Sequence, residues 1–245
     1  MAQRRHFVTR ARTQPTGPTL RAVPFVGTPA PNETIVLTSR QRQQLVQIGI
    51  RLRLPARKII YREGAVADSV FAIMDGAVKS YSELRSGKRA LCAFLFERDL
   101  FGLAERGHYV NSAQAVTPVD VYRLSMSQLT VLLKQDAELQ FHFLAKVTHE
   151  LRESHRRAVL VGRRDAAGRL AMFIQLMAAR RAGSSRSEVP LPMSRTDIAD
   201  YLGLSLESVS RAATELRRRG IVKFETPHLV RIVDGAAFAA LAAAV

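Results

Sequence analysis

Three polar residues in the segment SLESVSR, residues 205–211, carry chemistry that a protein can use to read a DNA base pair. Glu207, Ser210 and Arg211 are three and four positions apart, so they share one face if the segment is helical. Arginine can donate two hydrogen bonds to guanine, glutamate can accept one from the amino group of cytosine, and serine can bind a base or a phosphate. The alternative is a solvated helix face whose Glu207–Arg211 ion pair contributes roughly a few tenths of a kcal/mol.

The surrounding residues have the pattern of a helix-turn-helix unit over 195–219. Ser194 can cap a first helix, with Asp197 three positions later, and Ser205 can cap a second. Gly203 supplies the positive φ angle that the tight turn needs. The apolar residues of the unit are expected to face the core: Ile198, Ala199, Leu202, Val209 and Leu216. Such a unit places the first turns of its second helix in the major groove, so the pattern favours DNA reading by the three polar residues.

Basic and hydroxyl residues around the unit are candidates for contacts with DNA phosphates. Two short strands, at 221–224 and 229–233, flank the turn ETPH and would form a wing hairpin. Three cations on this wing could reach phosphates or simply keep an exposed sheet edge charged: Lys223, His228 and Arg231. The predicted phosphate contacts are Arg195, Thr196, Ser205, Ser208, Arg217 and Lys223.

The composition also favours a polyanionic partner. The 245 residues include 37 Lys and Arg against 21 Asp and Glu, which gives a net charge of +16. Double-stranded DNA is the first interpretation of this charge, an anionic membrane surface the second, and a basic surface kept for solubility the third. No apolar run approaches the roughly 18–20 residues that cross a bilayer, so no spanning segment is expected. Because nucleic acid is favoured over a membrane surface, no membrane partner is expected either.

Cysteine usage and the catalytic motifs narrow the function further. Cys92 is the only cysteine, which excludes a disulfide framework, a Cys-x-x-Cys zinc site and a cysteine-ligated iron–sulfur cluster within one chain. It lies in a predicted strand, RALCAFLF, and is expected to be a small core residue rather than a redox switch. A reducing cytoplasm fits best. No nucleophile elbow, phosphate loop or His-Glu-x-x-His motif is present, so neither an enzyme nor a bound cofactor is expected.

The chain divides by pattern into four predicted regions of an α+β fold. A basic tail, residues 1–36, has no acidic residue before Glu33 and is expected to be disordered, with an organellar transit peptide as the alternative. A sensor-type jelly-roll domain is expected at 37–130, a dimerisation helix at 131–162 and a winged helix-turn-helix domain at 163–245.

The jelly roll is predicted from short runs separated by turns. A helix is expected over 37–51, because Leu45, Ile48 and Leu52 recur at helical spacing. After it, apolar or alternating runs are separated by glycines, as in KIIYREGAVADSVFAIMDGAVKSY. Runs of about five to eight residues between such turns predict an antiparallel barrel or jelly roll.

From about residue 126 the apolar residues recur at helical spacing. A seam of six residues steps by three and four along the helix: Leu144, Val147, Leu151, Ser154, Ala158 and Val161. This seam could pack on the chain's own barrel. The small Ser154 and Ala158 would allow two helices to approach closely, so a homodimer is favoured.

These motifs together resemble the CRP/FNR superfamily of bacterial transcription regulators over about residues 37–235. The segment SRTDIADYLGLSLESVSR carries the Glu-x-x-Ser-Arg reading motif of the FNR and FixK branches. GRRDAAGRLAMFIQLM is similar to their linker helix, and IIYREGAVADSVFAIMDGAVKSY to the first half of their jelly roll. Glu97-Arg98 replaces the usual Pro-Gly, which leaves the expected fold unchanged.

Two departures from the family bear on the effector. The N-terminal cysteine cluster of oxygen-sensing FNR proteins is absent. The cyclic-AMP cassette is degenerate, because Leu103 follows Gly102 where a glutamate is usual, and Asn111-Ser112-Ala113 replaces Arg-Ser/Thr-Ala. Without the arginine, a buried cyclic phosphate would lack a counter-charge. Two residues could substitute for it: Arg106 and His108.

The resemblance therefore implies a FixK-like regulator that binds no nucleotide. It implies a palindrome with TTGAT-type half-sites, activation through RNA polymerase, and genes of low-oxygen or nitrogen-oxide metabolism. The alternative is a ligand-gated sensor with a nucleotide or haem in its barrel, for which four histidines are candidate axial ligands: His108, His142, His149 and His155. A third hypothesis, a regulatory barrel serving an enzyme or a membrane protein, is disfavoured by the helix-turn-helix pattern.

Overall fold

The structure, a computed structural model, describes residues 39–87, 89–97, 99–102, 104–162, 165–180 and 187–243. All of them belong to one compact unit that spans residues 34–245. The predicted tail, residues 1–36, lies outside the described residues. In the described ranges, no helix combines the length and the apolar character needed to cross a membrane.

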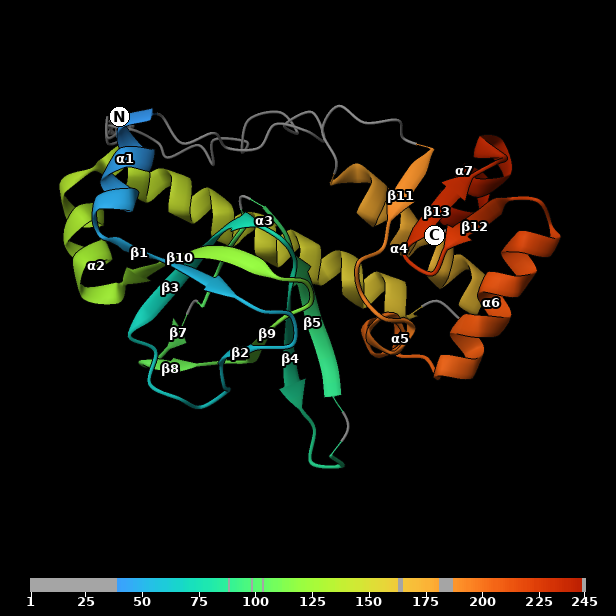
Figure 1. Cartoon of the computed structure of the whole chain (residues 1–245), viewed down its shortest axis with the longest axis horizontal. Helices are drawn as coiled ribbons and strands as arrows, with labels where there is room; N and C mark the ends of the chain where they lie inside the picture. The colour runs from blue at the N-terminus through green and yellow to red at the C-terminus, as the bar shows by residue number, and fades with distance from the viewer. Residues whose placement is uncertain are drawn as a thin grey trace, which may run out of the picture. The chain divides into compact units, whose positions relative to one another are not determined.

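Two antiparallel sheets form the barrel in the described part of the chain (Figure 1). The first has the order β1 (Gly49–Leu54), β10 (Val119–Ser125), β3 (Ser69–Asp75) and β6 (Leu100–Phe101). The second has the order β2 (Ile59–Tyr61), β9 (Ser112–Ala115), β4 (Val78–Glu83) and β5 (Arg89–Leu95). A small hairpin joins β7 (Ala104–Glu105) to β8 (His108–Tyr109). The predicted antiparallel barrel is confirmed.

The helix predicted over 37–51 is shorter than expected. Helix α1 covers Ser39–Gln47, and β1 begins at Gly49. Leu52 and Leu54 alternate toward the interior of the barrel, opposite Val121 and Val119 of β10. The helical spacing was misleading here, because pairing with a strand far along the chain outweighs local propensity.

The helical region from residue 126 contains two helices. Helix α2 covers Met126–Gln135 and α3 covers Ala137–Gly162. Between them Asp136 has extended backbone angles, and its side chain accepts a hydrogen bond of 2.8 Å from the backbone N–H of Leu139. Asp136 therefore ends one helix and caps the next.

The C-terminal part contains four helices and a three-stranded sheet among its described residues. The helices are α4 (Ala166–Ala179), α5 (Arg195–Leu202), α6 (Leu206–Arg218) and α7 (Gly235–Ala243). The sheet has the order β11 (Glu188–Pro190), β13 (Leu229–Ile232) and β12 (Val222–Thr226). Both wing strands are confirmed, and the segment similar to the family's linker helix forms α4. The sequence pattern did not indicate strand β11 at 188–190, which forms by pairing with β13.

An aromatic cluster links the barrel to the helices that follow it. The rings of Phe94 on β5, Phe173 on α4 and Tyr201 on α5 lie 5.4 to 5.9 Å apart between centroids. All three are buried in one apolar core. Cys92 does lie in β5 as predicted, but it is half-buried rather than part of the core.

Candidate DNA-binding site

The helix-turn-helix unit is held by local hydrogen bonds at both helix starts. At α5, Ser194 and Asp197 form a capping box: the Ser194 side chain accepts the Asp197 N–H, and the Asp197 side chain accepts the Ser194 N–H. At α6, the Ser205 side chain accepts the Ser208 N–H at 3.1 Å. Gly203 ends α5 in the left-handed region, with φ 63°. All three caps and turns predicted from the sequence are confirmed.

The apolar face of the unit fixes which side of α6 points outward. Ala199 on α5 is buried, so the second helix packs closely against the first. Val209 and Leu216 on α6 are buried in the same core. Because α6 buries this face, the residues on its opposite face must be exposed.

The three predicted reading residues lie on that outer side of α6. The side chains of Glu207 and Arg211 are 71% and 80% exposed, and they form an ion pair with each other. Ser210 is half-buried beside them. At this exposure the ion pair stabilises the helix by only about 0.3–0.5 kcal/mol, so a base pair can replace it.

Sequence reasoning missed Leu206, the first residue of α6. Its side chain is 49% exposed and lies next to Glu207. Exposed apolar groups in the major groove contact the C5-methyl group of thymine. Its position in the sequence could have indicated this exposure. Leu206 directly follows the capping Ser205 and comes before the buried residues of α6.

Four of the six predicted phosphate contacts lie at the starts of the two helices. Arg195, Thr196 and Ser205 are exposed, and Ser208 is half-buried. The guanidinium of Arg195 lies 5.7 Å from the ring centroid of Phe224 on β12, which ties this end of α5 to the wing. Helix starts favour phosphate, because their backbone N–H groups and the helix dipole attract anions. Arg217, near the end of α6, is also exposed.

The wing cations already have protein partners. Lys223 pairs with Glu225 at 2.9 Å, and Arg231 pairs with Glu188 at 2.8 Å and with Glu225 at 3.4 Å. The hydrogen bond from Lys223 lowers the pKa of Glu225 below its ordinary value. His228 uses Nδ1 in a 3.0 Å hydrogen bond with a backbone carbonyl. Lys223 remains 61% exposed and can still reach a phosphate.

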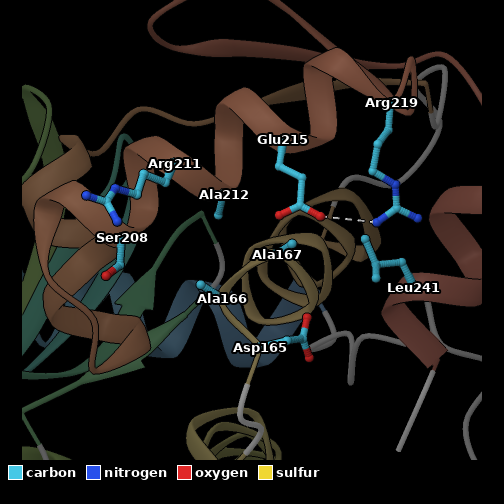
Figure 2. Close-up of a pocket in the computed structure, with 9 residues that line it drawn as sticks. All are labelled: Asp165, Ala166, Ala167, Ser208, Arg211, Ala212, Glu215, Arg219 and Leu241. Carbon is cyan, nitrogen blue, oxygen red and sulfur yellow. Dashed lines mark hydrogen bonds and ion pairs between the residues drawn. The ribbon is translucent and has the colours of Figure 1, made fainter.

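A pocket of about 430 Å³ opens beside α6 (Figure 2). It lies between the start of α4, the side of α6 and helix α7. Figure 2 shows Ser208 and Arg211 at one end, and Glu215 paired with Arg219 at the other. Ser208 and Arg211, which are predicted to contact DNA, therefore also line this pocket.

Two polar side chains of the degenerate effector cassette are hydrogen-bonded within the chain. Asn111 accepts a hydrogen bond of 3.3 Å from the Tyr61 hydroxyl, and Ser112 accepts one of 3.0 Å from the Glu63 N–H. Ala113 is fully buried. Gly102 has φ 88°, and a Cβ at this position would lie 3.1 Å from the Phe71 ring. Leu103 lies outside the described residues.

A stack of aromatic rings fills the barrel beside this cassette. Tyr61, Phe71, Phe101 and Tyr109 are buried, with ring centroids 3.9 to 6.0 Å apart. The Tyr109 hydroxyl donates a hydrogen bond of 2.8 Å to the Ser69 carbonyl. Burial raises the pKa of the Tyr61 hydroxyl. Among the described residues, this part of the interior is therefore lined by aromatic rings and by hydroxyls that are hydrogen-bonded within the chain.

The residues considered as ligands for a cyclic phosphate or a haem are exposed or half-buried where their side chains are described. Arg106 and His108 are exposed, and they are joined by a 3.1 Å hydrogen bond between His108 Nδ1 and the Arg106 carbonyl. His142 is half-buried and His155 is exposed, both on α3, whereas the side chain of His149 is outside the description. No cluster of three or more His, Cys, Asp or Glu suited to a metal occurs among the residues that the structure describes.

The predicted dimer residues form an apolar stripe along the first part of α3. Leu144, Val147 and Leu151 are 55%, 45% and 56% exposed. Phe141, which sequence reasoning missed, is 56% exposed one turn earlier. Two further seam residues, Ser154 and Ala158, are exposed as well. The last one, Val161, is half-buried against the core of its own chain.

Comparison with known proteins agrees with both halves of the chain. Residues 168–241 match the family described as a Crp-like helix-turn-helix domain, and residues 51–136 match the cyclic nucleotide-binding domain. The transcriptional activatory protein AadR of Rhodopseudomonas palustris is 31% identical over 205 residues, which are 82% of this chain and 85% of that protein. The nitrogen fixation regulation protein FixK of Bradyrhizobium diazoefficiens is 30% identical over 213 residues, which are 85% and 88% of the two chains.

A solved structure extends this similarity to three dimensions. FixK2 from Bradyrhizobium japonicum superposes with a TM-score of 0.75 and 32% identity, over 81% of this chain and 99% of that one. These relatives are described as regulators rather than as enzymes.

Proposed function

Because this chain belongs to the CRP/FNR family of DNA-binding transcription regulators, we propose that it is a FixK-like activator that binds a TTGAT-type palindrome as a homodimer. It would act in the cytoplasm, without a nucleotide in its barrel. The observation that carries the proposal is the exposed face of α6, where the side chains of Glu207 and Arg211 are 71% and 80% exposed and pair with each other.

The chemistry of this face suits a TTGAT half-site. Its central G·C pair offers guanine acceptors to Arg211 and a cytosine amino group to Glu207. The neighbouring T·A pairs present thymine methyl groups, which suit the exposed side chain of Leu206. Ser210, between them, can bind a base or a phosphate.

The apolar stripe on α3 supports the homodimer. Monomeric proteins rarely leave a continuous apolar row in solvent, so the row Phe141, Leu144, Val147 and Leu151 suits a second copy of the same helix. A two-fold dimer would present two α6 helices to half-sites one helical turn apart.

The degenerate effector cassette supports regulation without a nucleotide. Although the domain has the cyclic nucleotide-binding fold, Asn111 and Ser112 are engaged within the chain, and aromatic rings fill the adjacent interior. A cyclic phosphate buried there would be left without a cation.

The activating role and the target genes are proposed from the relatives. AadR is described as a transcriptional activatory protein, and FixK as a nitrogen fixation regulation protein. By this analogy, the protein recruits RNA polymerase to genes of low-oxygen or nitrogen-oxide metabolism.

A titration of the purified full-length chain tests the operator and the dimer together. The labelled duplexes are a TTGAT palindrome, the same duplex with one half-site scrambled, and a fully scrambled duplex. We expect the palindrome to bind at least about 1,000-fold more tightly than the scrambled duplex, with the half-site between them. Equal affinities for all three duplexes would contradict the proposed operator.

A second measurement tests whether the barrel is ligand-free. Calorimetric titration with cyclic AMP, cyclic GMP and haem should show no saturable binding. Saturable binding at micromolar concentration, with a change in operator affinity, would instead support the ligand-gated alternative.

A further inference from the structure

The barrel makes a charged contact with the first helix of the helix-turn-helix unit. Lys79, on strand β4, forms an ion pair with Asp197 in the first turn of α5. Both side chains are only 13% exposed. Lys79 lies opposite Phe94 in the sheet, and the Phe94 ring packs on Tyr201 of α5, so the ion pair borders the aromatic cluster. The attraction between two charges that are largely buried is stronger than between two charges on an open surface, because the surrounding dielectric constant is lower.

A second acid of α5 faces the same barrel cations. Burial raises the pKa of Asp200, and the neighbouring Asp197 raises it further, whereas Lys79 and Arg89 lower it. Arg89 begins strand β5, and its guanidinium lies 4.8 Å from the ring centroid of Tyr81. Asp197 therefore pairs directly with a cation of the β4–β5 hairpin, and the charges of Lys79 and Arg89 also act on Asp200.

Asp197 has two tasks in this contact. One carboxylate oxygen accepts hydrogen bonds from the backbone N–H and the hydroxyl of Ser194, which closes the capping box. The other oxygen accepts the Lys79 ammonium. Lys79 thus fixes the residue that shapes the start of α5, where Arg195 and Thr196 are expected to meet phosphates.

The opposite end of α5 is held by cations from two other helices. Arg157 of α3 donates to the Tyr201 carbonyl at 3.3 Å, and Arg169 of α4 donates to the Leu202 carbonyl at 3.0 Å. Cations stabilise a helix at its carbonyl end. Helix α5 is therefore connected to the barrel, to α3 and to α4.

These contacts leave the DNA-facing side open. While Lys79 holds α5, Glu207 and Arg211 on α6 remain 71% and 80% exposed. The barrel contact is therefore compatible with DNA binding, and it does not cover the reading face.

We propose that Lys79 is a positioning residue for DNA binding: through Asp197 it fixes the helix-turn-helix unit against the barrel, so that the two units of a dimer keep the spacing of the two half-sites. The barrel then holds the helix-turn-helix unit in position, and this role needs no ligand. This inference rests on the proposed palindrome and dimer. It assigns Lys79 no contact with DNA.

The test compares the palindrome with the single half-site for the full-length variant Lys79→Met, which keeps most of the apolar stem. A palindrome needs both units in register and a half-site needs one. Palindrome affinity should therefore fall about tenfold and half-site affinity threefold or less. Lys79→Arg, which keeps the cation, should recover most of the difference. Circular dichroism and a thermal melt confirm that each variant is folded at the assay temperature.

Two controls separate positioning from general effects. Lys58→Met removes the same charge from an exposed site of the barrel, and Tyr81→Phe removes from β4 a hydroxyl without a hydrogen-bond partner among the described atoms. Neither should change the ratio of palindrome to half-site affinity. In addition, Lys79→Met should have little further effect in an Asp197→Asn background, because the pair acts as a unit.

The outcomes separate this inference from the proposed function. If the wild-type chain does not prefer the palindrome to the half-site, the proposed function fails. If it does prefer the palindrome and Lys79→Met leaves that preference unchanged, lowers both affinities equally, or adds fully to Asp197→Asn, Lys79 is not a positioning residue.

Discussion

The helix-turn-helix unit and the barrel cassette differ in whether their polar side chains face solvent or are hydrogen-bonded within the chain. On α6, Glu207 and Arg211 face solvent, and their bond to each other is weak enough to be exchanged. In the cassette, Asn111 and Ser112 are bonded within the chain beside a stack of buried rings. Both regions match their family descriptions, but only the first leaves its polar groups available to a partner. The match to a cyclic nucleotide-binding domain therefore does not by itself assign a ligand to this barrel.

The largest effect is expected from a charge in the α3 stripe, because palindrome binding needs both helix-turn-helix units of the proposed dimer. Val147→Glu would bury two glutamates at a two-fold interface, at a cost of about 3–5 kcal/mol each. Sedimentation should show a monomer that has lost its preference for the palindrome. Val131→Glu is the control, since Val131 is also exposed but lies on α2. A Val147→Glu variant that remains dimeric would place the interface elsewhere.

The next effect tests the reading face directly. Arg211→Ala should lose about 2–6 kcal/mol of palindrome affinity, because a bidentate arginine–guanine contact contributes roughly 1–3 kcal/mol in each half-site. Affinity for a scrambled duplex should fall far less, since the phosphate contacts remain. A parallel loss on both duplexes would identify Arg211 as a phosphate contact.

A glycine substitution tests whether the cassette is only structural. Gly102→Ala places a side chain at a positive φ angle and against the Phe71 ring, so we expect about 2 kcal/mol less unfolding free energy. Gly87→Ala has the same backbone strain but open space around its Cβ, and it should cost less. Chemical denaturation measures both. Palindrome affinity below the melting temperature should be unchanged, and a loss there would mean that the cassette still controls DNA binding.

Two substitutions on α6 should separate its apolar and acidic contributions. Leu206→Ala should lose about 1 kcal/mol on the palindrome, and none when thymine is replaced by uracil, which lacks the methyl group. Glu207→Ala should relax the preference for the G·C pair with little loss of non-specific affinity, because it removes a negative charge near phosphates. Titrations with single-base variants of the palindrome would measure both effects.

The smallest effect is expected in the wing. Lys223→Ala should weaken all duplexes about equally and reduce the slope of log affinity against log salt by about one per subunit. An unchanged slope would indicate that Lys223 remains paired with Glu225 in the complex.

The local parts of the site could be predicted from the sequence, and the long-range parts could not. Ser194, Gly203 and Ser205 reveal the helix pair because their capping and turn geometry depends only on neighbouring residues. Strand β11 escaped prediction because its strand character comes from pairing with β13 about forty residues later. The same reason explains the error at β1.

The contact of the barrel with α5 left no local signal at all. Lys79 and Asp197 are 118 positions apart, and each is an ordinary charged residue in its own segment. Helix α7, with its run of alanines, also escaped prediction. Its sequence, GAAFAALAA, contains one aromatic residue, Phe238, which is buried in the structure.

The ion pair between Glu207 and Arg211 also has a consequence for the speed of operator search. A protein with a charge of +16 is attracted to every stretch of duplex, and long stays on wrong sequences would slow its diffusion along the chromosome. The Glu207 carboxylate beside Arg211 offsets part of the attraction of this helix face for passing phosphates, because it repels them. Only a G·C pair in the correct position offers each residue a new partner at the same moment. The pair should therefore shorten the residence time on non-specific DNA while leaving the final complex intact.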